Sequence, residues 1–113
     1  MASETANEPA KKRLVMLAGD ATSGESCRTF VFKGETHTLG NALRAVILQN
    51  PSVVFCAYSM PHPAEDQMLL RIQTVDGYTA QDALRKGLQD LKEMCQATKD
   101  VFNKAMDDFN SAQ

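Results

Sequence analysis

The stretch from Thr79 to Asn110 reads TAQDALRKGLQDLKEMCQATKDVFNKAMDDFN, and it contains no proline and a single glycine, Gly87. Thr79 is a favourable N-cap residue and Asp82 suits the first helical turn, so the sequence predicts that a helix begins near residue 79. A helix of about 31 residues would be roughly 46 Å long. A compact domain of this chain length is only about 35 Å across. The sequence therefore predicts a helix that extends beyond its own domain.

An apolar seam runs along this predicted helix. Eight seam residues are spaced alternately by four and three positions, as in a heptad repeat: Leu84, Leu88, Leu91, Cys95, Thr98, Phe102, Ala105 and Phe109. A second row, spaced by seven, widens the seam: Ala80, Gly87, Met94 and Val101. For the first half of the helix, a domain core and a partner surface explain the seam equally well. For the second half we expect a partner surface, because one short helix and a small sheet cannot cover so much apolar area.

The seam supplies the candidate partner interface of this chain. Its expected members are Leu84, Gly87, Leu88, Leu91, Met94, Cys95, Val101 and Phe102. Gly87 costs about 1 kcal/mol relative to alanine inside a helix. Either another backbone approaches closely at this glycine, or the glycine is merely tolerated.

The rest of the chain shows the periodicities of a small sheet and a shorter helix. Apolar runs at 14–17 and 29–33 predict two strands joined by a loop. Helical spacing of apolar residues, ended by Pro51, predicts a helix over 38–49. Residues 53–60 are apolar on both faces, which predicts an interior strand, whereas the alternation in 68–75 predicts a half-exposed strand.

Composition limits the possible functions. A length of 113 residues allows one domain, which we expect over 12–110 between a disordered tail at 1–11 and a C-terminal tail at 111–113. The net charge of −2 provides no basic field for autonomous binding of DNA or RNA. No segment approaches the roughly 20 apolar residues of a membrane span. The short run Lys11-Lys12-Arg13 is either a solvated face or a nuclear address, and we assign it no function.

The sequence contains no motif that indicates catalysis or a cofactor. The three cysteines are widely spaced, and neither His37 nor His62 has a partner at metal-ligand spacing. Gly34 and Gly40 do not form a phosphate-binding loop, and the Glu65-Asp66 pair lies in a charged loop. We therefore expect no metal, no cofactor and no enzymatic activity.

Four segments carry a family resemblance. The segment His37-Thr38-Leu39-Gly40-Asn41-Ala42-Leu43-Arg44 closely resembles a motif of RNA polymerase alpha-type subunits. FCAY at 55–58, PHP at 61–63 and LRIQT at 70–74 resemble the smaller alpha-like subunits of eukaryotic polymerases. The resemblance covers about residues 27–106 and implies an α+β fold, the RNA polymerase alpha-type dimerisation domain. That fold has a four-stranded, mostly antiparallel sheet packed by two helices, the second a long C-terminal dimerisation helix.

Departures from the bacterial pattern indicate the subtype. Only a short connection, 60–67, stands where bacterial alpha and the larger eukaryotic alpha-like subunit insert a domain. Ala45 replaces the second arginine of the bacterial motif, so the contacts of that arginine are not expected here. The motif from Asn41 to Arg44, Cys56 and the stretch 82–91 look most similar to the small subunit shared by RNA polymerases I and III. The polymerase II counterpart is the alternative.

The resemblance implies a non-catalytic assembly subunit. Its expected partners are the larger alpha-like subunit, as an obligate heterodimer, and the two largest polymerase subunits, which assemble on that pair. Such a subunit would support synthesis of rRNA, tRNA and 5S RNA in the nucleus, including the nucleolus. Gly40 and Ala42 would allow close packing that sets the angle between subunits. Arg44 would face outward, either binding a carboxylate or carbonyl of a largest subunit or remaining solvated.

Two hypotheses from other classes are also compatible with the pattern. A small homodimeric α+β enzyme could hold its site at the dimer interface, although acid, base and phosphate signals are missing. The seam alone also permits a free-standing homodimeric coiled-coil adaptor.

Overall fold

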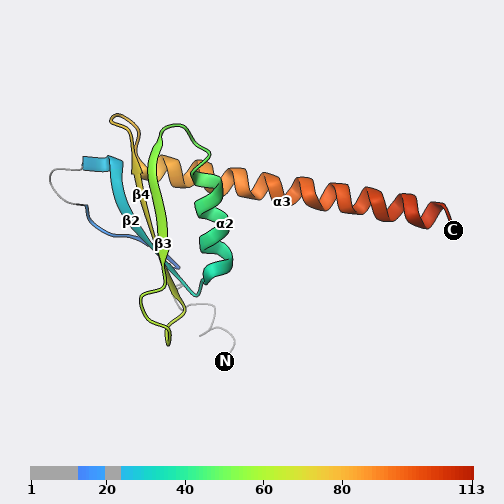
Figure 1. Ribbon diagram of the computed structural model, residues 1–113, viewed down its shortest axis with the longest axis horizontal. Helices are drawn as coiled ribbons and strands as arrows, with labels where there is room; N and C mark the ends of the chain where they lie inside the picture. The colour runs from blue at the N-terminus through green and yellow to red at the C-terminus, as the bar shows by residue number, and fades with distance from the viewer. Residues whose placement is uncertain (1–12, 20–23) are drawn as a thin grey trace, which may run out of the picture.

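The computed structural model describes residues 13–19 and 24–113, which form one antiparallel sheet covered on one face by two helices (Figure 1). The predicted tail at 1–11, together with Lys11 and Lys12 of the basic run, lies outside the described residues. The elements follow in the order β1 (Leu14–Met16), β2 (Cys27–Lys33), α2 (His37–Ile47), β3 (Val53–Ser59), β4 (Gln67–Thr74) and α3 (Ala80–Ser111). A 3-10 turn, Gly24–Ser26, precedes β2 and was not predicted. The expected α+β fold is confirmed.

The order of the strands in the sheet is β1-β2-β4-β3. The strand β4 lies between β2 and β3 and pairs antiparallel with both, with Leu70 opposite Phe30 on one side and Tyr58 on the other. The prediction of an interior strand at 53–60 is therefore wrong, because β3 is an edge strand. Its exposed side chains include Val54 and Phe55, which are 61% and 45% accessible. Strand order depends on pairing between distant segments, which the period-two pattern of one segment does not contain.

The core fills the space between the sheet and the two helices. Alternate residues of β2 and β4 face the helices, as the half-exposed pattern predicted for β4 requires. α2 contributes Leu43 and Ile47, and α3 contributes residues only from its first turns. The fully buried large side chains are Phe30, Leu43, Ile47, Met68, Leu70 and Ile72.

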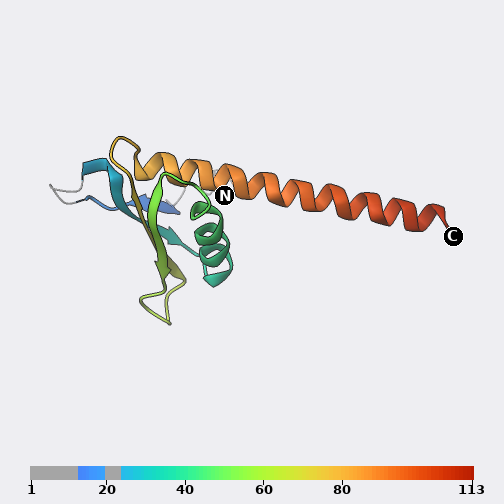
Figure 2. The ribbon, with the colours of Figure 1, turned by 45° about the horizontal axis from the view of Figure 1, so that its top comes forward.

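The helix α3 has 32 residues and begins as predicted, with the Thr79 hydroxyl accepting a hydrogen bond from the Asp82 backbone N–H at 3.0 Å. It leaves the domain as a rod (Figures 1 and 2), and the longest dimension of the molecule is 64 Å. From Lys92 to the last residue, every position is exposed. The predicted overhang is confirmed. Within the described ranges, no helix combines the length and the apolar character needed to cross a membrane.

Candidate partner-binding site

The first part of α3, residues 80–91, belongs to the domain and is called the core half here. Ala80, Ala83 and Leu84 are buried in the main core, and Leu84 is only 4% accessible. Leu91 is half-buried and packs against the same core, whereas Leu88 lies at its border. Two residues of the predicted partner interface, Leu84 and Gly87, are thus interior positions of this chain. The chain's own sheet and α2 cover most of the surface of both residues.

Gly87 is enclosed by a side chain and not by a backbone. A Cβ atom at this position would lie 2.4 Å from Cγ1 of Ile47 and 3.2 Å from its Cδ1. Ile47 is 1% accessible and cannot move aside. Of the two alternatives given for Gly87, the close approach of another backbone is not found among the described residues: the glycine makes room for the Ile47 side chain, which packs α2 against α3.

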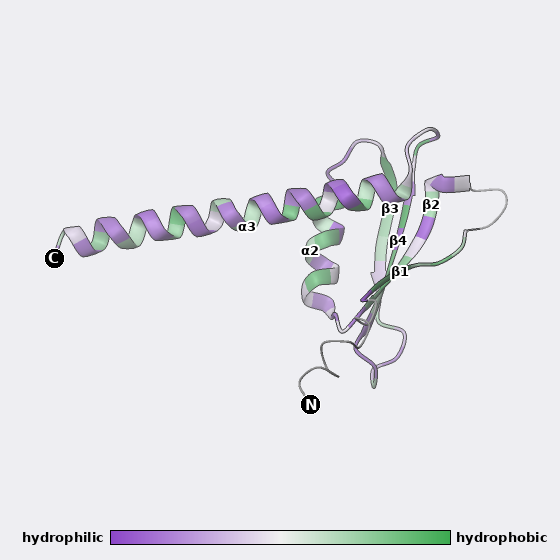
Figure 3. Cartoon of the chain, turned by 180° about the vertical axis from the view of Figure 1, so that it is seen from behind, coloured by the Kyte–Doolittle hydropathy of each residue, from purple (hydrophilic) through white to green (hydrophobic). Residues whose placement is uncertain are grey.

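The remainder of α3, residues 92–111, is called the free half. Apolar side chains recur along it at the predicted spacing, and bands of hydrophobic residues alternate with hydrophilic ones down the rod (Figure 3). We call these residues the free stripe: Met94, Cys95, Thr98, Val101, Phe102, Ala105, Met106 and Phe109. Val101 is 70% and Phe102 is 62% accessible. The free stripe begins at a shallow depression, which is lined by Leu91, Met94, Cys95, Thr98, Lys99 and Phe102.

Met106 is a free-stripe residue that the sequence analysis missed, and it is 41% accessible. It follows Phe102 by four positions and precedes Phe109 by three, so the helical spacing could have revealed it. Among the described residues, no other element packs against the free half, and the hydrogen bonds of its side chains join neighbouring turns of the same helix. Lys104 pairs with Asp108 at 3.0 Å, and Gln96 donates to Asp100 at 2.9 Å. Such pairs stabilise a helix by only about 0.2–0.5 kcal/mol each.

The motif helix α2 divides into buried and exposed positions. Leu43 is fully buried, Gly40 is buried and Leu39 is half-buried against the core. His37, Thr38 and Asn41 are exposed. The motif therefore combines three core positions with three surface positions at the start of α2.

The space above Gly40 is filled from within the chain. A Cβ atom at Gly40 would lie 2.6 Å from Cδ2 of Tyr58 on β3. The close packing expected at Gly40 is therefore made with Tyr58 of the same chain, whereas the expected role of Gly40 and Ala42 in setting the angle between subunits stays a prediction. The hydroxyl of Tyr58 also hydrogen-bonds Nδ1 of His37 at 3.0 Å, so the glycine, the ring and the histidine together join α2 to the sheet edge.

Arg44 is half-buried rather than fully outward. Among the described residues, it has no hydrogen-bond or ion-pair partner. Burial raises the pKa of the Cys56 thiol to about 11, and the positive charge of Arg44 partly opposes that rise. The guanidinium is therefore near Cys56 and still has its donors available. These donors suit a carboxylate or a main-chain carbonyl of another chain, and solvent satisfies them equally well.

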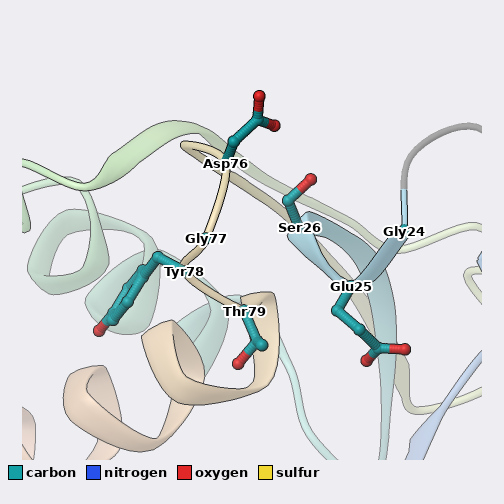
Figure 4. A pocket seen from close by; sticks show the side chains of 7 residues that line it. All are labelled: Gly24, Glu25, Ser26, Asp76, Gly77, Tyr78 and Thr79. Carbon is teal, nitrogen blue, oxygen red and sulfur yellow. The ribbon is translucent and has the colours of Figure 1, made fainter.

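A polar pocket lies where β4 passes into α3 (Figure 4). Its lining side chains point apart: Asp76 and Glu25 face solvent, whereas Tyr78 faces α2. The Tyr78 hydroxyl accepts a hydrogen bond from Asn50 Nδ2 at 3.2 Å, and Glu25 pairs with Arg28 at 2.9 Å. These side chains serve the fold and do not converge on a ligand. No cluster of metal-ligating side chains occurs in the part of the chain that the structure describes.

Comparisons with known proteins agree with this arrangement of elements. Residues 27–109 match the RNA polymerase Rpb3/Rpb11 dimerisation domain. The chain belongs to this family. The resemblance predicted from the motif of α2 is confirmed.

Two curated relatives in the Rpb3/Rpb11 family are described as DNA-directed RNA polymerases I and III subunit RPAC2. The Schizosaccharomyces pombe protein is 46% identical over 104 residues, covering 92% of this chain and 82% of that protein. The Drosophila melanogaster protein is 48% identical over 98 residues, covering 87% and 92%. Subunit L of the Thermoplasma acidophilum RNA polymerase has the same fold, with a TM-score of 0.72, 19% identity and coverage of 88% and 94%.

Proposed function

We propose that this chain is the small alpha-like subunit shared by RNA polymerases I and III. It is non-catalytic, pairs obligately with the larger alpha-like subunit and provides, with that partner, the platform for the two largest subunits. The sequence identities of 46% and 48% to two RPAC2 proteins support the assignment to polymerases I and III. The polymerase II counterpart is the alternative. We propose that the chain acts in the nucleus, including the nucleolus.

The observation that carries the pairing role is the free stripe. Apolar side chains on an exposed helix that leaves its domain cannot be covered by the described part of the chain itself. We assign the contact with the larger alpha-like subunit to Leu88, Leu91, Met94, Cys95, Val101 and Phe102. Burying apolar side chains of this size stabilises a complex by about 1.5–3 kcal/mol each before the costs of association.

Affinity purification of the tagged chain from cells tests the assignment to polymerases I and III. We expect the larger alpha-like subunit and the largest subunits of polymerases I and III to co-purify, without those specific to polymerase II. Recovery of polymerase II subunits instead would establish the alternative. A small homodimer without polymerase subunits would refute the proposal.

The platform role is tested with Arg44→Glu. Because Arg44 has no partner in the described chain, reversing its charge leaves the core contacts of α2 in place. We expect the pair with the larger alpha-like subunit to persist while recovery of a largest subunit falls by about tenfold, since one charge-assisted contact becomes a repulsion. Loss of the alpha-like partner with retention of the largest subunits would reverse the assignment of the two surfaces.

A further inference from the structure

We propose that the free stripe binds a helix of a different chain that places carboxylates opposite Lys92 and Lys99, and that these two lysines select that partner over a second copy. The inference rests on the pairing role proposed above and adds the chemistry of the partner. It follows from the two borders of the stripe, which differ in character.

One border of the seam is cationic. Arg85, Lys92 and Lys99 are spaced by seven residues, and each follows a seam residue by one position, so they form one row along α3, which Met106 continues. Lys99 lines the depression at the start of the free stripe, and Lys92 lines a second depression beside Leu14 and Leu88. In the free half, the opposite border is apolar at Met94 and Val101, and Asp108 ends that row.

The two lysines have no partner within the described chain. Three other cations of α3 are paired: Arg85 with Asp82 at 3.3 Å, Lys86 with Asp90 at 2.8 Å and Lys104 with Asp108 at 3.0 Å. Lys92 and Lys99 have neither an ion pair nor a side-chain hydrogen bond among the described residues. When a partner helix covers the free stripe, both ammonium groups lie at the rim of the apolar interface. There, carboxylates on the other chain stabilise the complex and fix its register.

A nucleic acid fits this border poorly. Glu93 and Asp100 follow Lys92 and Lys99 by one position, and Asp107 continues that acidic row. A phosphate backbone along the lysines would therefore lie beside a row of carboxylates. A protein surface with carboxylates at fixed positions meets the lysines without that repulsion.

A second copy of the chain also fits poorly. Two copies packed antiparallel along the seam bring the cationic borders together. Packed in parallel, they set Lys99 beside Met94, and Lys92 beside the position of the buried Gly87. Neither arrangement supplies a carboxylate, so the charge pattern favours a partner of different sequence.

The test measures affinity for the larger alpha-like subunit of polymerases I and III from the same organism, at about 50 mM and about 500 mM salt. The wild-type affinity should fall as salt rises. The double variant Lys92→Glu/Lys99→Glu should bind about tenfold more weakly at low salt, and its affinity should no longer fall with salt. The control is Lys86→Glu/Lys104→Glu, which changes net charge equally at positions turned away from the seam and also removes the exposed ion pairs with Asp90 and Asp108. This control should bind as the wild type does.

The test distinguishes failure of the inference about Lys92 and Lys99 from failure of the proposed function. If both double variants bind as the wild type does, the lysines have no selective role and the inference is overturned. If the wild-type chain sediments as a dimer whose affinity rivals that of the complex, selection against a second copy is overturned. Absence of any complex between the wild-type chain and the larger alpha-like subunit would refute the proposed function itself.

Discussion

The core half and the free half of α3 carry the same heptad spacing but occupy different surroundings. In the core half, Leu84 and Gly87 are enclosed by α2 and the sheet. In the free half, Val101 and Phe102 occupy equivalent rows of the helix and are exposed. A hydrophobic repeat therefore identifies a surface that requires cover, whereas helix length relative to domain size decides whether the cover is internal.

The largest effect that separates the two halves is expected from Leu84→Asp. This change buries an unpaired carboxylate and removes apolar contacts in the core, at a cost of about 5 kcal/mol or more. Such a cost approaches the whole stability of a small domain. We expect no soluble, folded chain even when the partner is co-expressed, as measured by soluble yield and far-ultraviolet circular dichroism. A folded Leu84→Asp complex would place Leu84 outside the essential core.

In the free half, Phe102→Asp should leave the fold intact and disrupt pairing. Phe102 contacts no core residue, so the circular dichroism of the chain should be unchanged. The complex with the larger alpha-like subunit should weaken by about 2–4 kcal/mol, because a carboxylate replaces an interface aromatic side chain. Asn103→Asp adds the same charge on another face of α3 and should have little effect on affinity. Equal losses for both variants would exclude a specific role for the stripe.

A smaller effect is expected from Gly87→Ala. The alanine gains about 1 kcal/mol of helix propensity but overlaps Ile47, which should leave a net destabilisation of about 1–2 kcal/mol. Ile47→Ala removes the overlapped atoms and should itself cost about 2–4 kcal/mol. Urea unfolding of the two single variants and the double variant gives the coupling. The double variant should lose about 1 kcal/mol less unfolding free energy than the two single variants lose in total. Strictly additive losses would contradict the contact between Gly87 and Ile47.

The smallest expected effect is a difference in reactivity among the three cysteine thiols, which does not involve a change in stability. Cys95 in the free half is exposed, whereas Cys27 and Cys56 are buried. With a pKa of about 11, the Cys56 thiol stays protonated near neutral pH, so its thiolate is scarce. A maleimide should therefore modify Cys95 first, and pairing with the larger alpha-like subunit should protect it, as peptide mass mapping would measure. Unchanged labelling of Cys95 in the complex would place the interface elsewhere.

Most elements were predictable because their signals are local. The N-cap Thr79, the uninterrupted stretch to Asn110 and the Pro51 stop each depend on neighbours in sequence. The edge position of β3 and the approach of Ile47 to Gly87 were not predictable, because they depend on residues far apart in the chain. For the same reason, the seam spacing predicted an apolar surface along α3 but not that Leu84 and Gly87 are interior.

The free half has a consequence for copies of the chain that lack a partner. An isolated helix of about 20 residues is marginally stable in water. The last turn of α3 contains no basic residue, and Asp107 and Asp108 oppose the negative end of the helix dipole. Unassembled copies should therefore present a fraying, apolar segment to proteases and chaperones, which the proposed pairing would cover. The cellular abundance of this chain should consequently follow the abundance of its partner, because unpaired copies are degraded through their exposed helix.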